Sequence, residues 1–199
     1  LRVFDLESGE EKWTFDYEAP GRLSFPGSRT VPAVTERYIY TAGGFGHVHC
    51  FDREAREPVW GVNVEEVYGG ERPMFGWSSA PLVVDDLVIV TALGEEVGLI
   101  AFDRKTGDEI WITEGLGFSH STPTLLNMLG EEQVVFLATS GQASGQDEAA
   151  PTTVHAFHPA DGMPLWKHDT LLTRLPIPAP IQIDENRFFL TGGYRGGST

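Results

Sequence analysis

The sequence is short of cysteine, of basic residues and of long apolar runs. Cys50 is the only cysteine among 199 residues, so an intramolecular disulfide is excluded. No apolar run approaches the roughly 20 residues that a transmembrane helix needs, and no membrane span is predicted. Lys and Arg total 14 against 29 Asp and Glu, which gives a formal net charge of −15. Because such an acidic surface repels phosphate backbones, nucleic acid is not an expected partner.

Turn-forming residues, by contrast, are abundant. The chain has 23 Gly and 13 Pro, and 41% of its residues are apolar. Frequent turns with few helix-like apolar periods indicate many short strands around a packed core. The sequence begins at Leu1 inside a motif, so the lack of a signal peptide in this stretch carries no information about export.

One pattern occurs four times, and in each copy a Phe is followed nine residues later by a Trp. In three copies a Gly stands five residues after the Phe. The Phe is expected to end one strand and the Trp to lie in the next. The Gly then falls in the tight turn between them, where a positive φ is needed. The repeated residues are Phe4, Gly9 and Trp13; Phe51 and Trp60; Phe102, Gly107 and Trp111; and Phe157, Gly162 and Trp166.

An Asp follows the Phe in the first three copies, and its carboxylate can accept backbone N–H groups of the turn. Two copies depart from the pattern. The second has Arg56 where the others have Gly, and the fourth has His158 where the others have Asp. We expect these two turns to be looser or differently hydrogen-bonded.

Prolines at 32, 81, 123 and 180 are each expected to start a strand, a position that tolerates proline. A β-rich run follows each of them, so one unit contains four short strands: the Pro strand, a β-branched strand, the Phe strand and the Trp strand. The tryptophans of the pattern, at 13, 60, 111 and 166, are 47, 51 and 55 residues apart. Four strands in a repeat of this length are typical of a β-propeller blade. The predicted fold is therefore an all-β propeller of four-stranded antiparallel blades.

The strings AFDRKTGDEIW (from Ala101) and VFDLESGEEKW (from Val3) resemble the PQQ-like repeat. That repeat is found in quinoprotein alcohol dehydrogenases and in their cofactor-free relatives, including the outer-membrane assembly lipoprotein of the β-barrel machinery. The resemblance covers essentially the whole chain. It implies that the four repeated tryptophans pack between adjacent blades, and that the protein is extracytoplasmic, in the periplasm or cell envelope.

The chain is expected to form one propeller domain over residues 1–199, with about four blades' worth of sequence. Two arrangements remain open. In the first, the chain belongs to a propeller of seven or eight blades, whose missing blades are its partners. In the second, the two partial blades at the ends pair and close a four-bladed ring. The segments are the end of a blade at 1–16, whole blades at 31–64, 80–114 and 122–169, and the start of a blade at 179–199.

A binding site is predicted where the loops that precede the Pro strands converge. The Pro strands should be innermost and line the central channel, so polar and aromatic residues just before the prolines should meet at its mouth. These groups could hold a small ligand or a peptide. Alternatively, they cap strand ends and hold channel water. The candidate residues are Arg29, Trp77, Ser78, His120 and Ser121.

No catalytic or metal-binding set is predicted. Resemblance to the quinoprotein dehydrogenases implies an adjacent Cys–Cys pair and a calcium site containing Glu, Asn and Asp, but Cys50 is alone and no asparagine matches such a motif. His47 and His49 share a strand face and could begin a metal site. However, His155 and Ile100 occupy the position of His49 in later copies, and an apolar replacement indicates packing.

The sequence therefore predicts a non-catalytic binding or scaffolding module for a protein or small ligand, with no cofactor. The alternative is a quinone (PQQ)-dependent dehydrogenase that uses PQQ with Ca²⁺. Under that alternative, some of the cofactor residues lie outside this stretch.

Overall fold

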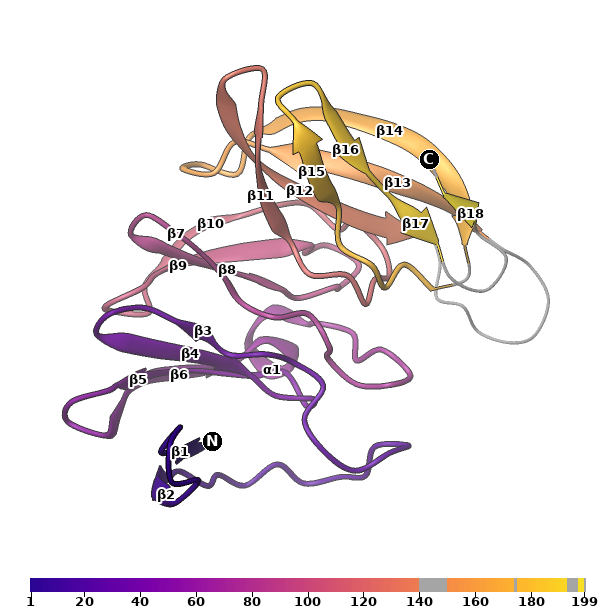
Figure 1. Ribbon diagram of the computed structural model, residues 1–199. Helices are drawn as coiled ribbons and strands as arrows, with labels where there is room; N and C mark the ends of the chain where they lie inside the picture. Colours follow the sequence, from indigo (N-terminus) through magenta and orange to yellow (C-terminus); the bar gives the residue numbers. More distant parts are fainter. Residues whose placement is uncertain (140–149, 174, 193–196, 199) are drawn as a thin grey trace.

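The structure, a computed structural model, describes residues 1–139, 150–173, 175–192 and 197–198. Three antiparallel four-stranded sheets, each a meander in chain order, form its body. They lie one above another from the N-terminus to the C-terminus (Figure 1). The strands are β3 (Ala33–Val34), β4 (Tyr38–Ala42), β5 (His47–Asp52) and β6 (Glu57–Asn63); β7 (Leu82–Val84), β8 (Leu87–Thr91), β9 (Leu99–Asp103) and β10 (Glu109–Ile112); and β11 (Thr124–Met128), β12 (Glu131–Thr139), β13 (Ala150–Phe157) and β14 (Pro164–Thr173).

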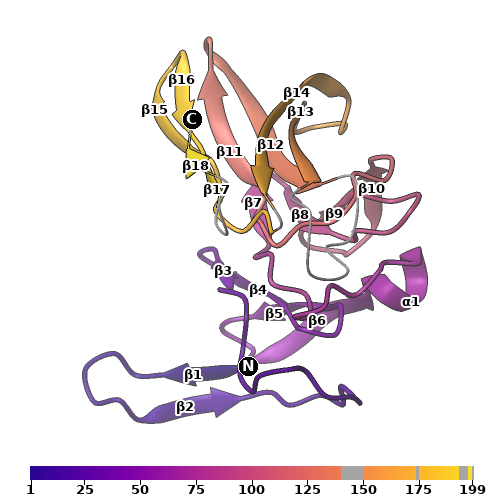
Figure 2. The same ribbon diagram turned by 90° about the vertical axis from the view of Figure 1, so that its right-hand side faces the viewer.

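The two ends of the chain form separate small sheets. β1 (Arg2–Phe4) pairs with β2 (Glu11–Thr14), and β15 (Ile181–Asp184) pairs with β16 (Arg187–Phe189). A further short pair joins β17 (Thr191–Gly192) to β18 (Gly197–Ser198). β1–β2 and β15–β16 lie at opposite ends of the stack in both views (Figures 1 and 2). The four-bladed ring closed by these strands is therefore not the arrangement found here.

The strand after each proline lies at the inner edge of its sheet. β3, β7 and β11 are edge strands, and β11 contacts both β7 and β15. Figure 2 shows β6, β10 and β14 on the other, outer side. The prolines stand one residue before each strand instead of within it, which removes the need for a proline N–H in the ladder. We refer below to the three four-stranded sheets as the second, third and fourth blades, and to β1–β2 and β15–β16 as the first and fifth.

The repeated turn is held by its aspartate. In the third blade, the Asp103 carboxylate accepts hydrogen bonds from the N–H groups of Lys105 (2.8 Å) and Thr106 (2.9 Å). Gly107, at φ 78°, donates its N–H to the Asp103 carbonyl at 2.9 Å. The pairing of the two flanking strands shifts register beside the repeated Phe or Trp in every copy, so the hairpin bends at the same place in each blade.

The second and fourth turns lack one of the repeated residues, and each compensates in its own way. Arg56 adopts φ 61° and donates its N–H to the Asp52 carbonyl at 2.9 Å, as the glycines do. The expectation of a looser second turn is thus wrong, because Arg56 takes the left-handed conformation itself. In the fourth blade Asp161 replaces the missing aspartate: its carboxylate accepts the Met163 N–H and lies 3.0 Å from His158 Nδ1.

Each repeated tryptophan contacts the next blade along the chain. Trp60 donates its Nε1–H to the Arg104 carbonyl at 3.2 Å, and Trp111 donates to the Pro159 carbonyl at 3.0 Å. At the two ends, Trp13 lies 6.2 Å from the Phe51 ring and Trp166 lies 6.1 Å from the Phe188 ring, centroid to centroid. The turn glycines allow this contact, since a Cβ at Gly107 or Gly162 would stand 2.6 to 2.7 Å from atoms of Trp60 or Trp111.

One element was not foreseen in the sequence. The helix α1 (Val64–Tyr68) follows β6 directly. The Asn63 side chain caps it by accepting the Glu65 N–H at 3.0 Å, and Gly69 ends it at φ 66°. In the described part of the chain, no helix is long and apolar enough to cross a membrane.

Candidate functional site

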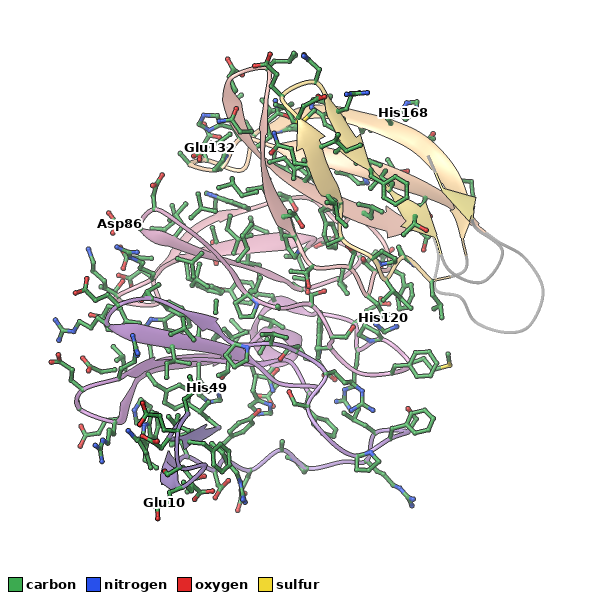
Figure 3. All side chains as sticks on the ribbon, viewed as in Figure 1. Glu10, His49, Asp86, His120, Glu132 and His168 are labelled. Atoms are coloured by element: carbon green, nitrogen blue, oxygen red, sulfur yellow. The ribbon has the colours of Figure 1, made fainter. Side chains whose placement is uncertain are left out.

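Four loops that lead into β3, β7, β11 and β15 meet around an open pocket of about 440 Å³. His120, at this site, lies on the side where the loops between blades project, whereas Asp86 and Glu132 mark strand turns on the opposite side (Figure 3). The walls are largely apolar, with a few polar groups and one arginine. Lining residues are Arg29, Thr30, Val31, Phe75, Ser78, Ala80, His120, Thr122 and Ile177.

His120 is the most buried polar residue of the pocket wall. Its side chain is 6% exposed and lies between Phe118 and Phe75, at ring-centroid distances of 4.9 and 5.7 Å. Nδ1 is 2.6 Å from the Ser78 hydroxyl oxygen, whereas Nε2 is buried without a hydrogen-bond partner. Burial lowers the pKa of His120, so the ring is neutral at physiological pH. A buried ring nitrogen without a partner is costly, and a ligand could satisfy it.

Arg29 brings a positive charge to the same pocket. Its guanidinium donates to the carbonyls of Gly27 (3.1 Å) and Phe25 (2.7 Å), which fix its position. None of the ion pairs formed among the described residues includes Arg29. Because a guanidinium carries five N–H donors, three of them remain for a ligand or water.

The predicted site residues divide into two groups. Arg29, Ser78 and His120 come together in the pocket wall. Trp77 and Ser121 do not: Trp77 is 3% exposed and belongs to the core of the second and third blades, and the fully buried Ser121 donates its hydroxyl to the Pro178 carbonyl at 3.1 Å. Ser121 therefore holds two loops together, and Trp77 packs.

The apolar residues of the pocket wall are not among the residues predicted from the sequence. Val31 stands immediately before its proline, as do Ala80 and Thr122 in the next two blades, so a repeat-position signal existed for them. Ile177 stands three residues before Pro180, in the same repeat position as Arg29. Phe75 stands six residues before Pro81, outside the two repeat positions, and gave no such signal.

The two histidines of β5 pack against aromatic rings. The rings of His47 and His49 are parallel with centroids 6.2 Å apart, and Tyr17 lies against both at 4.9 and 4.6 Å. Burial, and the neighbouring His47, lower the pKa of His49 to about 4. No group of three His, Cys, Asp or Glu side chains suited to a metal occurs within the described ranges.

Four-stranded antiparallel sheets that stack through a tryptophan, with their first strands along a common inner side, are the blades of a β-propeller. The repeat narrows this class further. A family model described as "Outer membrane protein assembly factor BamB" matches residues 1–175, and the chain belongs to this family of PQQ-like propellers.

Known proteins similar to the chain include both a dehydrogenase subunit and the assembly factor BamB. Subunit 1 of the methanol dehydrogenase [cytochrome c] of Methylorubrum extorquens is 33% identical over 95 residues, 46% of this chain and 14% of that protein. BamB from Moraxella catarrhalis aligns with 98% of this chain and 64% of its own, at 18% identity and a TM-score of 0.50. The computationally designed Ika8 protein aligns with 99% of this chain and 50% of its own, at 16% identity and a TM-score of 0.62. The chain thus spans only part of the proteins that it matches.

The cysteine content of this chain bears on whether it could hold a quinone as the resemblance implies. The adjacent cysteine pair is excluded because Cys50 is single and lies buried in β5. The pocket itself offers one cation, one neutral imidazole and an apolar wall.

Proposed function

We propose that this chain is a non-catalytic binding module of an extracytoplasmic PQQ-like propeller, which holds a small ligand or a segment of a protein partner in the pocket at its inner loops. One observation carries the proposal. The pocket combines an apolar wall with a buried imidazole nitrogen that has no partner and with an arginine that has no described counter-ion. Groups with unused hydrogen-bonding capacity around a hollow of ordinary ligand size are typical of recognition sites.

A pocket-blocking variant tests this function. Val31 lines the pocket and is 73% exposed, so Val31→Trp should fill the hollow without disturbing the core. Val34, 59% exposed in β3 of the same blade and outside the pocket, gives the matched control Val34→Trp. Ligand-observed NMR against a mixed library of acids, amines, alcohols and aromatic compounds should find binders that Val31→Trp abolishes and Val34→Trp retains. Binding that is absent, or equally affected by both variants, would refute the proposal.

A second candidate is a part of a quinone-dependent dehydrogenase, and the 33% identity to a methanol dehydrogenase subunit favours it. The test is to add PQQ and Ca²⁺ to the protein and to measure quinone absorbance and the oxidation of alcohols. Stoichiometric quinone binding with turnover would establish the dehydrogenase. Ligand binding in the pocket, with neither quinone uptake nor turnover, would favour the binding module.

A further inference from the structure

The pocket is built from one repeat position in four successive loops. Arg29, Ser78, His120 and Ile177 each stand three residues before the proline of their blade, and all four line the hollow. In an extended chain the residue one before the proline points the same way as the residue three before it, and Val31, Ala80 and Thr122 also line the pocket. Equivalent positions thus place a cation, a hydroxyl, an imidazole and apolar groups around one space.

The hydrogen bond between Ser78 and His120 links the tautomer of the imidazole to the direction in which the Ser78 hydroxyl points. Among the described residues, the Ser78 hydroxyl has no other acceptor than His120 Nδ1, 2.6 Å away. When this hydroxyl donates to Nδ1, the neutral ring carries its hydrogen on Nε2. The opposite tautomer would leave the hydroxyl hydrogen without a protein acceptor. With Ser78 as the donor, the buried, unpartnered Nε2 carries a hydrogen that lacks an acceptor oxygen.

With that tautomer, Arg29 and His120 both have unused donors in the pocket, and Arg29 is charged. Arg29 has N–H groups left after its two bonds to carbonyls, and His120 has Nε2–H. A carboxylate has only acceptors and carries the charge that complements a guanidinium, which makes their hydrogen bonds stronger than neutral ones. An amine would meet a cation with no described carboxylate beside it, and an uncharged amide would satisfy the donors less well.

The apolar residues of the pocket wall indicate what kind of group the ligand carries beside its carboxylate. Val31 and Ile177 are 73% and 47% exposed, and both line the pocket together with Phe75. Exposed aliphatic and aromatic groups around one hollow bind apolar groups because burial removes their surface from water. We infer that the pocket binds an apolar group that ends in a carboxylate, with the carboxylate at Arg29 and His120.

This inference rests on the proposed function, because it names the ligand class for the same pocket. The chemistry could come from a small hydrophobic acid or from the C-terminus of a protein with an apolar last residue. Two probe pairs separate these sources: 3-phenylpropanoate with its amide, and N-acetyl-Gly-Gly-Phe with a free or an amidated C-terminus. In calorimetric titrations, each carboxylate should bind at least about tenfold more tightly than its amide. A preference confined to the peptide pair would indicate a protein C-terminus.

Arginine variants test the cation with a matched charge change. Arg29→Gln should weaken carboxylate binding by about tenfold or more and leave amide binding within about twofold. Arg22→Gln, in the same loop but outside the pocket, is the control and should change neither. Equal effects of the two substitutions would mean that only the overall charge of the protein matters, and would overturn the inference.

The imidazole is tested in the unmodified protein, which avoids variants that disturb a buried residue. Ring ¹⁵N shifts should show His120 with Nε2 protonated and Nδ1 bare, and 3-phenylpropanoate should shift the Nε2–H signal. An Nδ1-protonated ring would overturn the inference. If library ligands bind in a manner that Val31→Trp abolishes but carboxylates hold no advantage over amides, the inference fails while the proposed function stands. If nothing binds, both fail.

Discussion

The contact between a turn glycine and the tryptophan of the preceding blade gives the sharpest test of how these blades stack. Gly162 has φ 69°, and a Cβ there would stand 2.6 Å from Trp111 Cε3. Gly130, in the β11–β12 turn of the same blade, has φ 83° with nothing within 4 Å of its Cβ position. Gly130→Ala therefore measures the backbone cost alone, whereas Gly162→Ala adds the collision with the ring.

The expected magnitudes follow from these two geometries. An alanine in the left-handed region costs about 1–2 kcal/mol, which is the whole effect expected for Gly130→Ala. Trp111 is only 6% exposed and its indole N–H is bound to Pro159, so its ring cannot move away freely. Overpacking of this kind costs about 1–3 kcal/mol more. Gly162→Ala should therefore lose about 2–5 kcal/mol in all.

Urea unfolding followed by circular dichroism measures both variants, with midpoints compared at unchanged slope. The double variant Gly162→Ala with Trp111→Ala completes a cycle: without the indole, the cost of Gly162→Ala should fall to that of Gly130→Ala. Equal losses in the two single variants, or an unchanged cost in the Trp111→Ala background, would refute glycine–tryptophan packing as the basis of blade stacking.

Three further substitutions probe the repeat. Trp111→Ala alone should lower the unfolding free energy by about 3–5 kcal/mol; a loss below about 1 kcal/mol would show that the indole does not join the blades. Arg56→Gly should raise it by about 0.5–1 kcal/mol, because glycine removes the left-handed strain at φ 61° but adds chain entropy to the unfolded state. The low pKa of His49 means that the unfolded chain takes up its proton first as pH falls, so stability should drop between about pH 6.5 and 4. Solvent screening limits this loss to about 1–2 kcal/mol, and His49→Ile, the residue of the third blade at this position, should flatten that part of a pH–stability curve.

Local turn chemistry made most of the fold predictable. The spacing of Phe, Gly and Trp identified hairpins whose aspartate and glycine hydrogen bonds recur in the structure, and the prolines marked where each inner strand begins. Arg56 shows the limit of such reasoning. From residue type alone, a turn that lacks glycine is expected to change its conformation. However, the free-energy cost of a left-handed arginine is small compared with the stabilisation from the contacts of a packed blade.

The site was only partly predictable, because residue type alone does not tell which side chains of a loop face the pocket. An extended chain alternates its side chains between two faces. The positions three before all four prolines and one before the first three of them accordingly line the pocket. Positions four and two before a proline face the packing between blades, which is why Trp77 and Ser121 are buried. Thr30 is the exception: its position is two before Pro32, yet it lines the pocket while its hydroxyl bonds the Ala42 carbonyl at 2.5 Å. Choosing only the residues three before each proline would have retained Arg29, Ser78 and His120 as predicted site residues. It would also have excluded Trp77 and Ser121 and included Ile177. The same count applies to any further blade that carries this repeat: the residue three before its proline should face the channel, and its charge would extend or oppose the carboxylate site.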